Sequence, residues 1–460
     1  MPSEKFRRQL YGEVKQWRKE ELIDTSLYQQ LHERYQFTEL ETSARNRFVL
    51  ILLSLGSILL GLGIITFVGA NWQIWSRESK LILLLSVFVG LNAVGFYLWR
   101  SPTERWQRHL GKGLLLSGAF AFGANLVLMS QLFHQTSPLY QFFLVWGLGV
   151  LAMAYSLRLT LLGTLAIFLT GIGYVWGQGQ PAFLDIGEFF WLRQMMQYMP
   201  VLAGLMFVPL AYWCQSRWIF RLAILLMVYS LETNLLSLNL LRSPAWLVAV
   251  ACALPPALLW AYHDSLWGKI VSTKESFKDT ARTLAITFLS LVLYLLSFYR
   301  LWDISSISLV VQNSSLPWSS LINILILGCF TIWAWLRLWQ RWDRKTSIVA
   351  SMIALVALIP YWHLSTVQLT LEAVLIFNLL LFILAAGLVR EGLAQGKRRL
   401  FWSGLVLLTL QISTRMLEYQ TDLLLKSLVL LMCGCGIIAA GLWFERYVRR
   451  QGAKIIGKQL

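Results

Sequence analysis

Residues 139–157, LYQFFLVWGLGVLAMAYSL, and residues 159–177, LTLLGTLAIFLTGIGYVWG, are two apolar segments separated by a single basic residue, Arg158. Neither segment contains Asp, Glu, Lys or Arg. A transmembrane helix needs about 20 mostly apolar residues to cross the ~30 Å hydrocarbon core of a bilayer, so each segment is long enough to span it. Hydropathy does not distinguish a tight hairpin of two spans from one long tilted or re-entrant segment. We predict two spans.

Segments of this kind continue along most of the chain, which is 57% hydrophobic and 14% charged. Soluble domains are roughly 45–50% apolar and about 25% charged. The sequence predicts an all-α polytopic transmembrane helical bundle of about 14 spans within residues 47–445, embedded in a lipid bilayer. The spans are 48–70, 81–99, 113–133, 139–157, 159–177, 198–214, 218–239, 244–262, 282–301, 319–338, 346–364, 368–389, 400–417 and 423–444. No soluble catalytic domain of ~100 residues fits between them, which excludes most nucleotide-driven machines.

Residues 1–46 predict a cytoplasmic amphipathic helical hairpin. They carry eight basic and eight acidic side chains without a continuous apolar segment, so they do not resemble a signal peptide. Apolar residues at helical spacing predict helices over 4–20 and 25–36, and Asp24 begins a plausible N-cap sequence. These residues are Phe6, Leu10, Val14 and Trp17, then Tyr28, Leu31 and Tyr35. The hairpin packs on the cytoplasmic helix ends, docks on the lipid surface or binds a cytoplasmic protein partner.

The distribution of basic residues predicts the orientation in the membrane. Cytoplasmic loops are rich in Lys and Arg, and translocated loops are poor in them. The predicted spans place thirty-three of the 40 basic residues on the side of the N-terminus and seven on the opposite side or in the outer halves of spans. Both termini, including a basic tail at 446–460, are therefore expected in the cytoplasm of a cell with this protein in its inner (plasma) membrane. The net charge of +17 then follows from topology, and no nucleic acid partner is expected.

The sequence contains no pattern that calls for a cofactor or a metal. The five cysteines lie in or beside apolar segments without a CxxC pair. Cys433 and Cys435 are separated by about 200° around a helix, which directs their thiols apart. No Walker A loop, GxSxG elbow, HExxH helix or GxGxxG loop is present. We therefore expect neither cofactor nor metal, and cysteines that pack between helices.

Small residues at four-residue spacing predict close contacts between helices. Gly173 and Gly177 form a GxxxG pair. Ser57 with Gly61 and Gly436 with Ala440 have the same spacing.

Short motifs in the first third of the chain resemble a known family. They are Trp17 and Asp24 in the hairpin, Gly69-Ala70-Asn71-Trp72 at the end of the first span, and Gly123-Ala124-Asn125 followed by Gln131 and His134 in the third. This arrangement resembles the bacterial family of predicted membrane proteins called domain of unknown function 2157. The resemblance implies a bacterial membrane location. It implies no activity, because none is established for the family.

Polar and ionisable residues within the spans gather toward the predicted extracytoplasmic ends. A charge at the bilayer centre costs about 2.5–3.5 kcal/mol on insertion scales, so such residues normally face the bundle interior. The pattern predicts an outward-facing polar cavity. The candidate residues are Asn125, Gln131, His134, Glu232, Arg300, Asp303, His363, Glu372, Arg415 and Glu418.

Several of these candidates also have a structural explanation. Arg415 with Glu418, and Arg300 with Asp303, are three residues apart, so each pair can neutralise itself on one helix face. Glu232 has no basic residue within one turn of its helix and needs a partner from another helix, a water-filled cavity or protonation. His134 is either an interfacial histidine or a proton carrier oriented by Gln131.

Three classes of function fit these features. The first is a carrier or flippase-like protein that handles a small or lipid-linked solute through the outward-facing cavity. The second is a membrane-embedded transferase at the outer leaflet, in which Glu232 or His134 acts as a base and Arg300 or Arg415 holds a phosphate or carboxylate. The third is a noncatalytic assembly or regulatory protein. Composition does not separate them.

The predicted orientation can be tested by cysteine labelling in intact cells. A cysteine at Ser272 or Gly452 should not react with a membrane-impermeant reagent, because both positions are predicted to be cytoplasmic. A cysteine in the predicted outer loop at 178–197 is the positive control. Labelling at Ser272 or Gly452 in intact cells would contradict the orientation.

Overall fold

The computed structural model describes residues 4–20, 22–35, 59, 76–102, 104–132, 138–179, 190–236, 244–264, 276–302, 317–340, 343–365, 369–418 and 422–456. Among these residues there are 16 α-helices and no strand, which confirms the predicted all-α polytopic class. The chain divides into two compact units, Met1–Ser86 and Val87–Leu460. The predicted first span, 48–70, lies outside the described residues.

The N-terminal unit contains the predicted hairpin, formed by α1 (Glu4–Lys19) and α2 (Thr25–Arg34). Val14 is completely buried at its centre. Trp17 is half-buried and packs against it. Leu10, Tyr11, Ile23, Tyr28, Leu31 and Tyr35 complete the cluster. Because the two helices bury these apolar residues against one another, the hairpin has a small core of its own.

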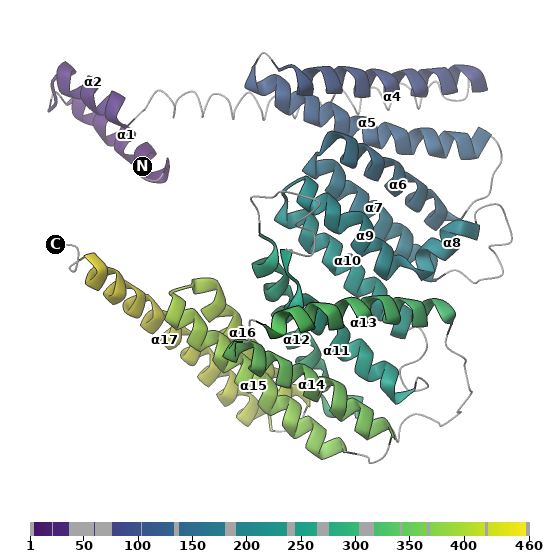
Figure 1. The fold of residues 1–460 in the computed structure, drawn as a ribbon. Coiled ribbons are helices and arrows are strands. Elements are labelled where there is room, and N and C mark those ends of the chain that lie inside the picture. Colours follow the sequence, from purple (N-terminus) through teal and green to yellow (C-terminus); the bar gives the residue numbers. More distant parts are fainter. Residues whose placement is uncertain are drawn as a thin grey trace. The chain divides into compact units, whose positions relative to one another are not determined.

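The remaining helices match the predicted spans (Figure 1). The first of them, α4, crosses the boundary between the two units at Ser86. Each of the thirteen spans predicted after the first contains one described helix. In chain order they are α4 (Arg77–Arg100), α5 (Arg105–Leu132), α6 (Leu139–Leu157), α7 (Thr160–Gln178), α8 (Phe190–Gln197), α9 (Met199–Trp213), α10 (Arg217–Leu236), α11 (Ala245–Ala261), α12 (Lys278–Leu296), the short 3-10 turn η3 (Tyr299–Leu301), α13 (Trp318–Trp339), α14 (Arg344–Ser365), α15 (Thr370–Gln395), α16 (Arg398–Glu418) and α17 (Leu423–Ile456).

Eleven of the described helices are long and apolar enough to cross a membrane. The short sixth span is different, because α8 and α9 together pass the same test but meet at an angle of 86°. Pro200 lies at the start of α9. Proline has no N–H to donate and its ring clashes with the carbonyl four residues earlier, so a helix that arrives at Pro200 cannot continue straight through it. The helix α11 is apolar, but with 17 residues it is shorter than the eleven.

The apolar segments around Arg158 form a tight hairpin of two helices, α6 and α7. Arg158 adopts the left-handed conformation, with φ of 52° and ψ of 37°, and its N–H bonds to the carbonyl of Ala154. The chain reverses at this residue, and α7 begins at Thr160. Gly147 packs against Thr170 across the hairpin, so a side chain at Gly147 would displace α7.

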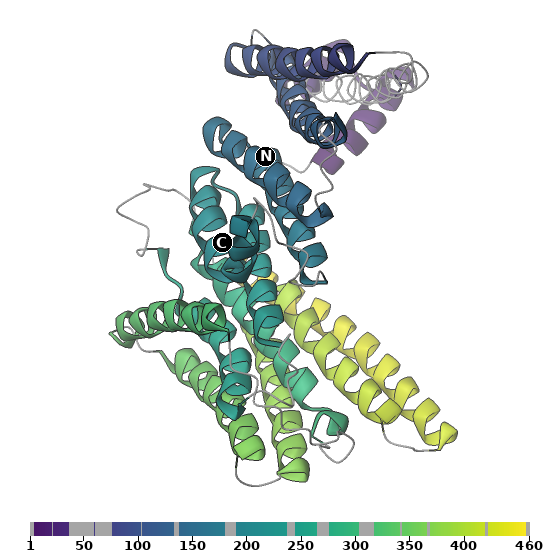
Figure 2. The ribbon, with the colours of Figure 1, turned by 90° about the vertical axis from the view of Figure 1, so that its right-hand side faces the viewer.

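The helices α6, α7, α9 and α10 lie side by side, and α11 packs on α12 and α14 (Figures 1 and 2). One continuous apolar core connects them, with Phe207, Phe220 and Leu289 completely buried. Aromatic side chains add hydrogen bonds between helices. Tyr155 donates to the carbonyl of Met206 at 2.6 Å, and the indole of Trp335 donates to the carbonyl of Ala257 at 3.0 Å.

Two of the predicted small-residue contacts lie in described helices. Gly173 lies against Leu144 of α6, and Gly177 lies against Met196 of α8, so this GxxxG pair does allow close packing. A Cβ atom added at Gly436 of α17 would have no described atom within 4 Å. The pair Ser57 and Gly61 lies outside the described residues.

The hairpin core can be tested at Val14. Val14→Asp should destabilise the hairpin by about 3 kcal/mol or more, because an unpaired carboxylate would replace a completely buried methyl-bearing side chain. Gln29→Asp places the same carboxylate at an exposed position of α2 and is the control. Limited proteolysis of residues 1–35 should be faster in Val14→Asp. Equal cleavage rates in the two variants would show that Val14 is not the core residue.

Candidate ligand-binding site

The break between α8 and α9 leaves the last carbonyl of α8 without a helical partner. The carbonyl oxygen of Gln197 instead accepts two side-chain hydrogen bonds, from Asn234 Nδ2 at 3.0 Å and from Asn323 Nδ2 at 2.7 Å. A carbonyl that ends a helix has no partner within the helix, so other donors must supply its hydrogen bonds. These two amides therefore stabilise the break and attach α10 and α13 to it.

Tyr174 of α7 fixes the position of Asn234. Its hydroxyl lies 3.0 Å from Asn234 Oδ1, 2.7 Å from Thr233 Oγ1 and 3.1 Å from the carbonyl oxygen of Ser230. Asn234 thus directs its oxygen toward α7 and its amide nitrogen toward α8. Four helices, α7, α8, α10 and α13, are linked by this group of polar contacts.

A polar pocket of about 230 Å³ lies at these helix ends. By the predicted orientation this is the extracytoplasmic end of the four helices. The lining residues are Gly177, Gln178, Arg193, Met196, Gln197, Asn234, Pro317, Ser319 and Ser320. Arg193 is the only charged side chain among these described residues. The pocket therefore has a positive charge beside neutral amides and hydroxyls.

The start of α13 adds to this positive character. Pro317 precedes the helix, and Ser319 and Ser320 lie in its first turn. The first N–H groups of an α-helix have no partner within the helix, and together they act as roughly half a positive charge. Helix starts of this kind bind phosphate and carboxylate groups, and a neighbouring guanidinium binds the same anions with two parallel hydrogen bonds.

Asn323 lies one turn further along α13 and leaves one acceptor unused. It is almost completely buried, and its Oδ1 accepts no hydrogen bond within the described chain. Buried polar atoms normally have a partner, either in the protein or in ordered water. This oxygen therefore favours a hydrogen-bond donor next to the helix break.

A second polar cluster contains two of the sequence candidates, Arg415 and Glu418. They form an ion pair on α16, with side chains 11% and 9% exposed. Arg415 also donates to the carbonyl oxygen of Ser297 at 2.7 Å, and Glu418 accepts the N–H of Tyr299 at 2.7 Å. The pair thus binds both backbone groups at the end of α12. This arrangement is the self-neutralising pair that the spacing allows, with an added role in holding α12.

Neutral polar residues surround this ion pair. Asn378 of α15 donates to the same Ser297 carbonyl at 3.1 Å, and Gln411 of α16 donates to the carbonyl of Asn378 at 2.9 Å. The guanidinium of Arg415 also lies over the ring of Phe298, 4.1 Å from its centroid. The cluster connects α12, α15 and α16.

His363 lies near this cluster but belongs to a different set of contacts. Its Nδ1 accepts the N–H of Leu369 at 3.0 Å, and its ring meets that of Trp302 edge-on at 4.9 Å. Its Nε2 is buried without a hydrogen-bond partner in the part of the chain described. These contacts are typical of a histidine that terminates α14 and packs in the protein interior.

The remaining sequence candidates are dispersed. Glu232 is half-buried on α10, and its Oε1 is buried and accepts no hydrogen bond from a described residue. Asn125 bonds to the carbonyl of Ala121 in its own helix. The side chains of Gln131, Arg300 and Glu372 are exposed. His134 and Asp303 lie outside the described residues.

A third polar cluster lies at the predicted cytoplasmic side, between the end of α11 and the start of α12. Burial opposes ionisation of Asp264, but its carboxylate accepts hydrogen bonds from Tyr212, Ser276 and the N–H groups of Phe277 and Lys278. The hydrogen bonds outweigh burial, so the pKa of Asp264 lies below its usual value. A carboxylate at the start of a helix is also stabilised by the helix dipole. Asp264 therefore holds α12 in place.

The pocket was not predicted from the sequence, because ionisable residues were ranked above amides and hydroxyls as candidates. Asn323, Asn234 and Ser320 are neutral, and Arg193 lies in the short helix before the sixth span. A signal was present in Pro200, close to the start of a short predicted span. Broken helices of this kind form binding sites in many transporters.

Comparison with known proteins identifies one family. Residues 15–163 match the family described as "Predicted membrane protein (DUF2157)", which confirms the resemblance of the N-terminal third. Comparisons with curated proteins and with solved structures give no significant match. The matched region ends before the candidate pocket, which lies on α7, α8, α10 and α13. Among the described residues, no group of three His, Cys, Asp or Glu side chains is placed to hold a metal ion.

The Arg415–Glu418 pair can be tested by substitution. Glu418→Gln should lower the free energy of unfolding by roughly 3–5 kcal/mol, because it leaves the mostly buried guanidinium without its counter-charge. Adding Arg415→Met to Glu418→Gln should recover part of this loss. Thermal unfolding in detergent measures both effects.

The control is Glu391→Gln, which breaks the ion pair with Lys345. Those side chains are 33% and 60% exposed, so the loss should be at most about 1 kcal/mol. A Glu418→Gln loss as small as the control, with no recovery in the double variant, would mean that the pair does not hold α12.

Proposed function

We propose that this protein binds an anionic solute in the polar pocket at the α8–α9 break and acts as a carrier for it. The observation that carries the proposal is the position of Arg193 in a pocket whose other polar lining residues are neutral. The ligand class is a phosphate- or carboxylate-bearing molecule.

The broken helix supports a carrier over a static binding protein. In carriers, substrate sites form where discontinuous helices leave backbone groups and helix ends available for binding. Here the α8–α9 break is flanked by Gln197, and the first turn of α13 faces the same pocket. A site that depends on helix ends changes when those ends move, which is the motion that alternating access requires.

The distribution of basic residues also indicates from which side of the membrane the ligand enters. The predicted orientation places this pocket at the extracytoplasmic ends of the helices, in the inner membrane of a bacterium. The ligand would then enter from outside the cytoplasm. The Arg415 cluster and Asp264 act as structural attachments in this scheme, because their charges are used in contacts that hold α12.

Anion binding can be tested by thermal unfolding of the detergent-purified protein in inorganic phosphate at constant ionic strength. A ligand at 100 times its Kd stabilises the folded state by about 2.7 kcal/mol. We expect phosphate to raise the Tm of the wild type, and Arg193→Gln to weaken that response at least ten-fold. Arg193→Lys should retain part of it, because lysine keeps the charge and loses the two-pronged hydrogen bonding.

The matched control is Arg300→Gln, which removes an exposed arginine from η3. It should leave the phosphate response unchanged. Uptake of radiolabelled phosphate into vesicles by the wild type, and not by Arg193→Gln, would separate a carrier from a static binding protein. A wild type whose Tm does not respond to phosphate, or identical responses of Arg193→Gln and Arg300→Gln, would contradict the proposed site.

A further inference from the structure

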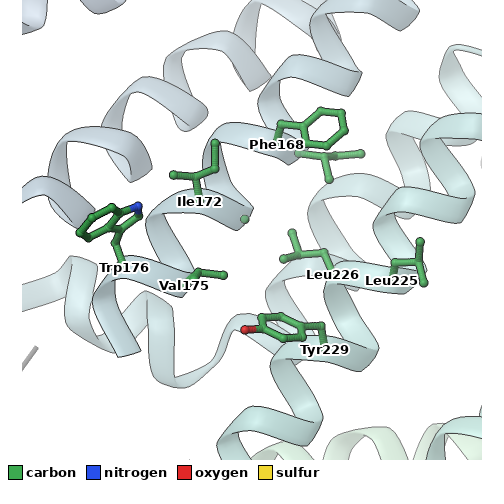
Figure 3. Close-up of a pocket in the computed structure, with 9 residues that line it drawn as sticks. Phe168, Ile172, Val175, Trp176, Leu225, Leu226 and Tyr229 are labelled. Carbon is green, nitrogen blue, oxygen red and sulfur yellow. The ribbon is translucent and has the colours of Figure 1, made fainter. Parts of the chain in front are cut away.

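An apolar groove of about 380 Å³ runs between α7 and α10, next to the polar pocket. In Figure 3, the side chains of Phe168, Ile172, Val175 and Trp176 lie on one side and those of Leu225, Leu226 and Tyr229 on the other. Gly171 also lines the groove. A Cβ atom added at Gly171 would lie 3.6 Å from Leu226 Cδ1, which is an ordinary van der Waals distance. The groove is open along the surface of two helices that are candidate membrane spans.

The groove and the pocket follow one another along the same helices. On α7, Gly171 and Val175 line the groove, and Gln178, one turn further on the same face, lines the pocket. On α10, Leu226 lines the groove and Asn234, two turns further, lines the pocket. Tyr229 of the groove meets Tyr174 edge-on at 6.2 Å, and Tyr174 bonds to Asn234.

The dimensions fit one leaflet of a bilayer. Phe168 and Trp176 are eight residues apart, so the groove extends for about 12 Å along α7. Half of the ~30 Å hydrocarbon core is about 15 Å. The polar pocket at the helix ends lies at the level where lipid headgroups begin, and the groove descends from it into the apolar layer.

We infer that the groove holds an acyl chain of a lipid whose anionic headgroup occupies the polar pocket. This inference rests on the proposed function and narrows its ligand to an amphiphile. The charge of Arg193 and the start of α13 favour a phosphate-bearing head, and the aliphatic and aromatic lining of the groove favours a hydrocarbon chain. Tyr229 and Trp176, both about half-exposed, have the amphipathic rings that are common at the membrane interface.

The experiment distinguishes binding of the lipid headgroup from binding of the acyl chain. Dioleoylphosphatidylglycerol, which has an anionic head, is added to the full-length protein in nonionic detergent, and bound lipid is counted by native mass spectrometry. Inorganic phosphate, followed by Tm, is the head-only probe. Dioleoylphosphatidylcholine, which has the same chains and no net charge, is the chain-only comparison. We expect the phosphatidylglycerol to bind at least ten-fold more tightly than the phosphatidylcholine.

Gly171→Trp fills the groove, and Gly328→Trp places the same side chain at a helical glycine of α13 with open space around it. Gly171→Trp should weaken phosphatidylglycerol binding at least ten-fold and leave the phosphate response unchanged. Gly328→Trp should change neither. Arg193→Gln should weaken both. If Gly171→Trp does not fold, Leu225→Trp in the groove and Leu205→Trp on α9, at similarly exposed positions, provide a second matched pair.

Equal phosphatidylglycerol affinities in the groove variant and its control would overturn the acyl-chain inference. Equal affinities of the wild type for the two lipids would also overturn it. A phosphate response that persists in these cases would leave the proposed pocket in place. A wild type without any phosphate response would instead count against the pocket itself, so the two failures are distinguishable.

Discussion

The carbonyl oxygen of Gln197 is the point on which the arrangement of the candidate site depends. The last carbonyls of a helix have no partner within it and need donors from elsewhere. Two asparagines from two different helices supply donors here. These hydrogen bonds attach α8 to α10 and α13, and Tyr174 brings α7 into the same group. The pocket is the space that these helix ends enclose.

The same constraint explains why other polar groups of the bundle are structural. Where α12 ends, Arg415 donates to a backbone carbonyl and Glu418 accepts a backbone N–H. Where α12 begins, Asp264 accepts hydrogen bonds from backbone N–H groups. Each charge is used to satisfy backbone groups that a helix end exposes. Arg193 lines a pocket together with neutral polar groups and a helix start, and this combination supports the proposal of an anionic ligand.

The sequence predicted the architecture well because span length and hydropathy are local properties. It placed thirteen described helices, including the hairpin at Arg158, which depends on one residue in the left-handed conformation. The site was harder to predict, since it depends on which helices are neighbours. Arg415 and Glu418 were found together because they share a helix turn. Asn234 and Asn323 are far apart in sequence and meet only at Gln197. Helical spacing predicted both Val14 and Trp17 on the packed face, but which of them is completely enclosed depends on how the two helices pack.

The central claim is that the pocket at the helix break binds an anion-bearing lipid, and an experimental structure in lipid nanodiscs containing phosphatidylglycerol tests it most directly. We expect density for a phosphate group within hydrogen-bond distance of Arg193 and the first turn of α13, continuous with chain density between α7 and α10. A pocket filled by protein side chains, with α7 and α10 in contact along the groove, would contradict it.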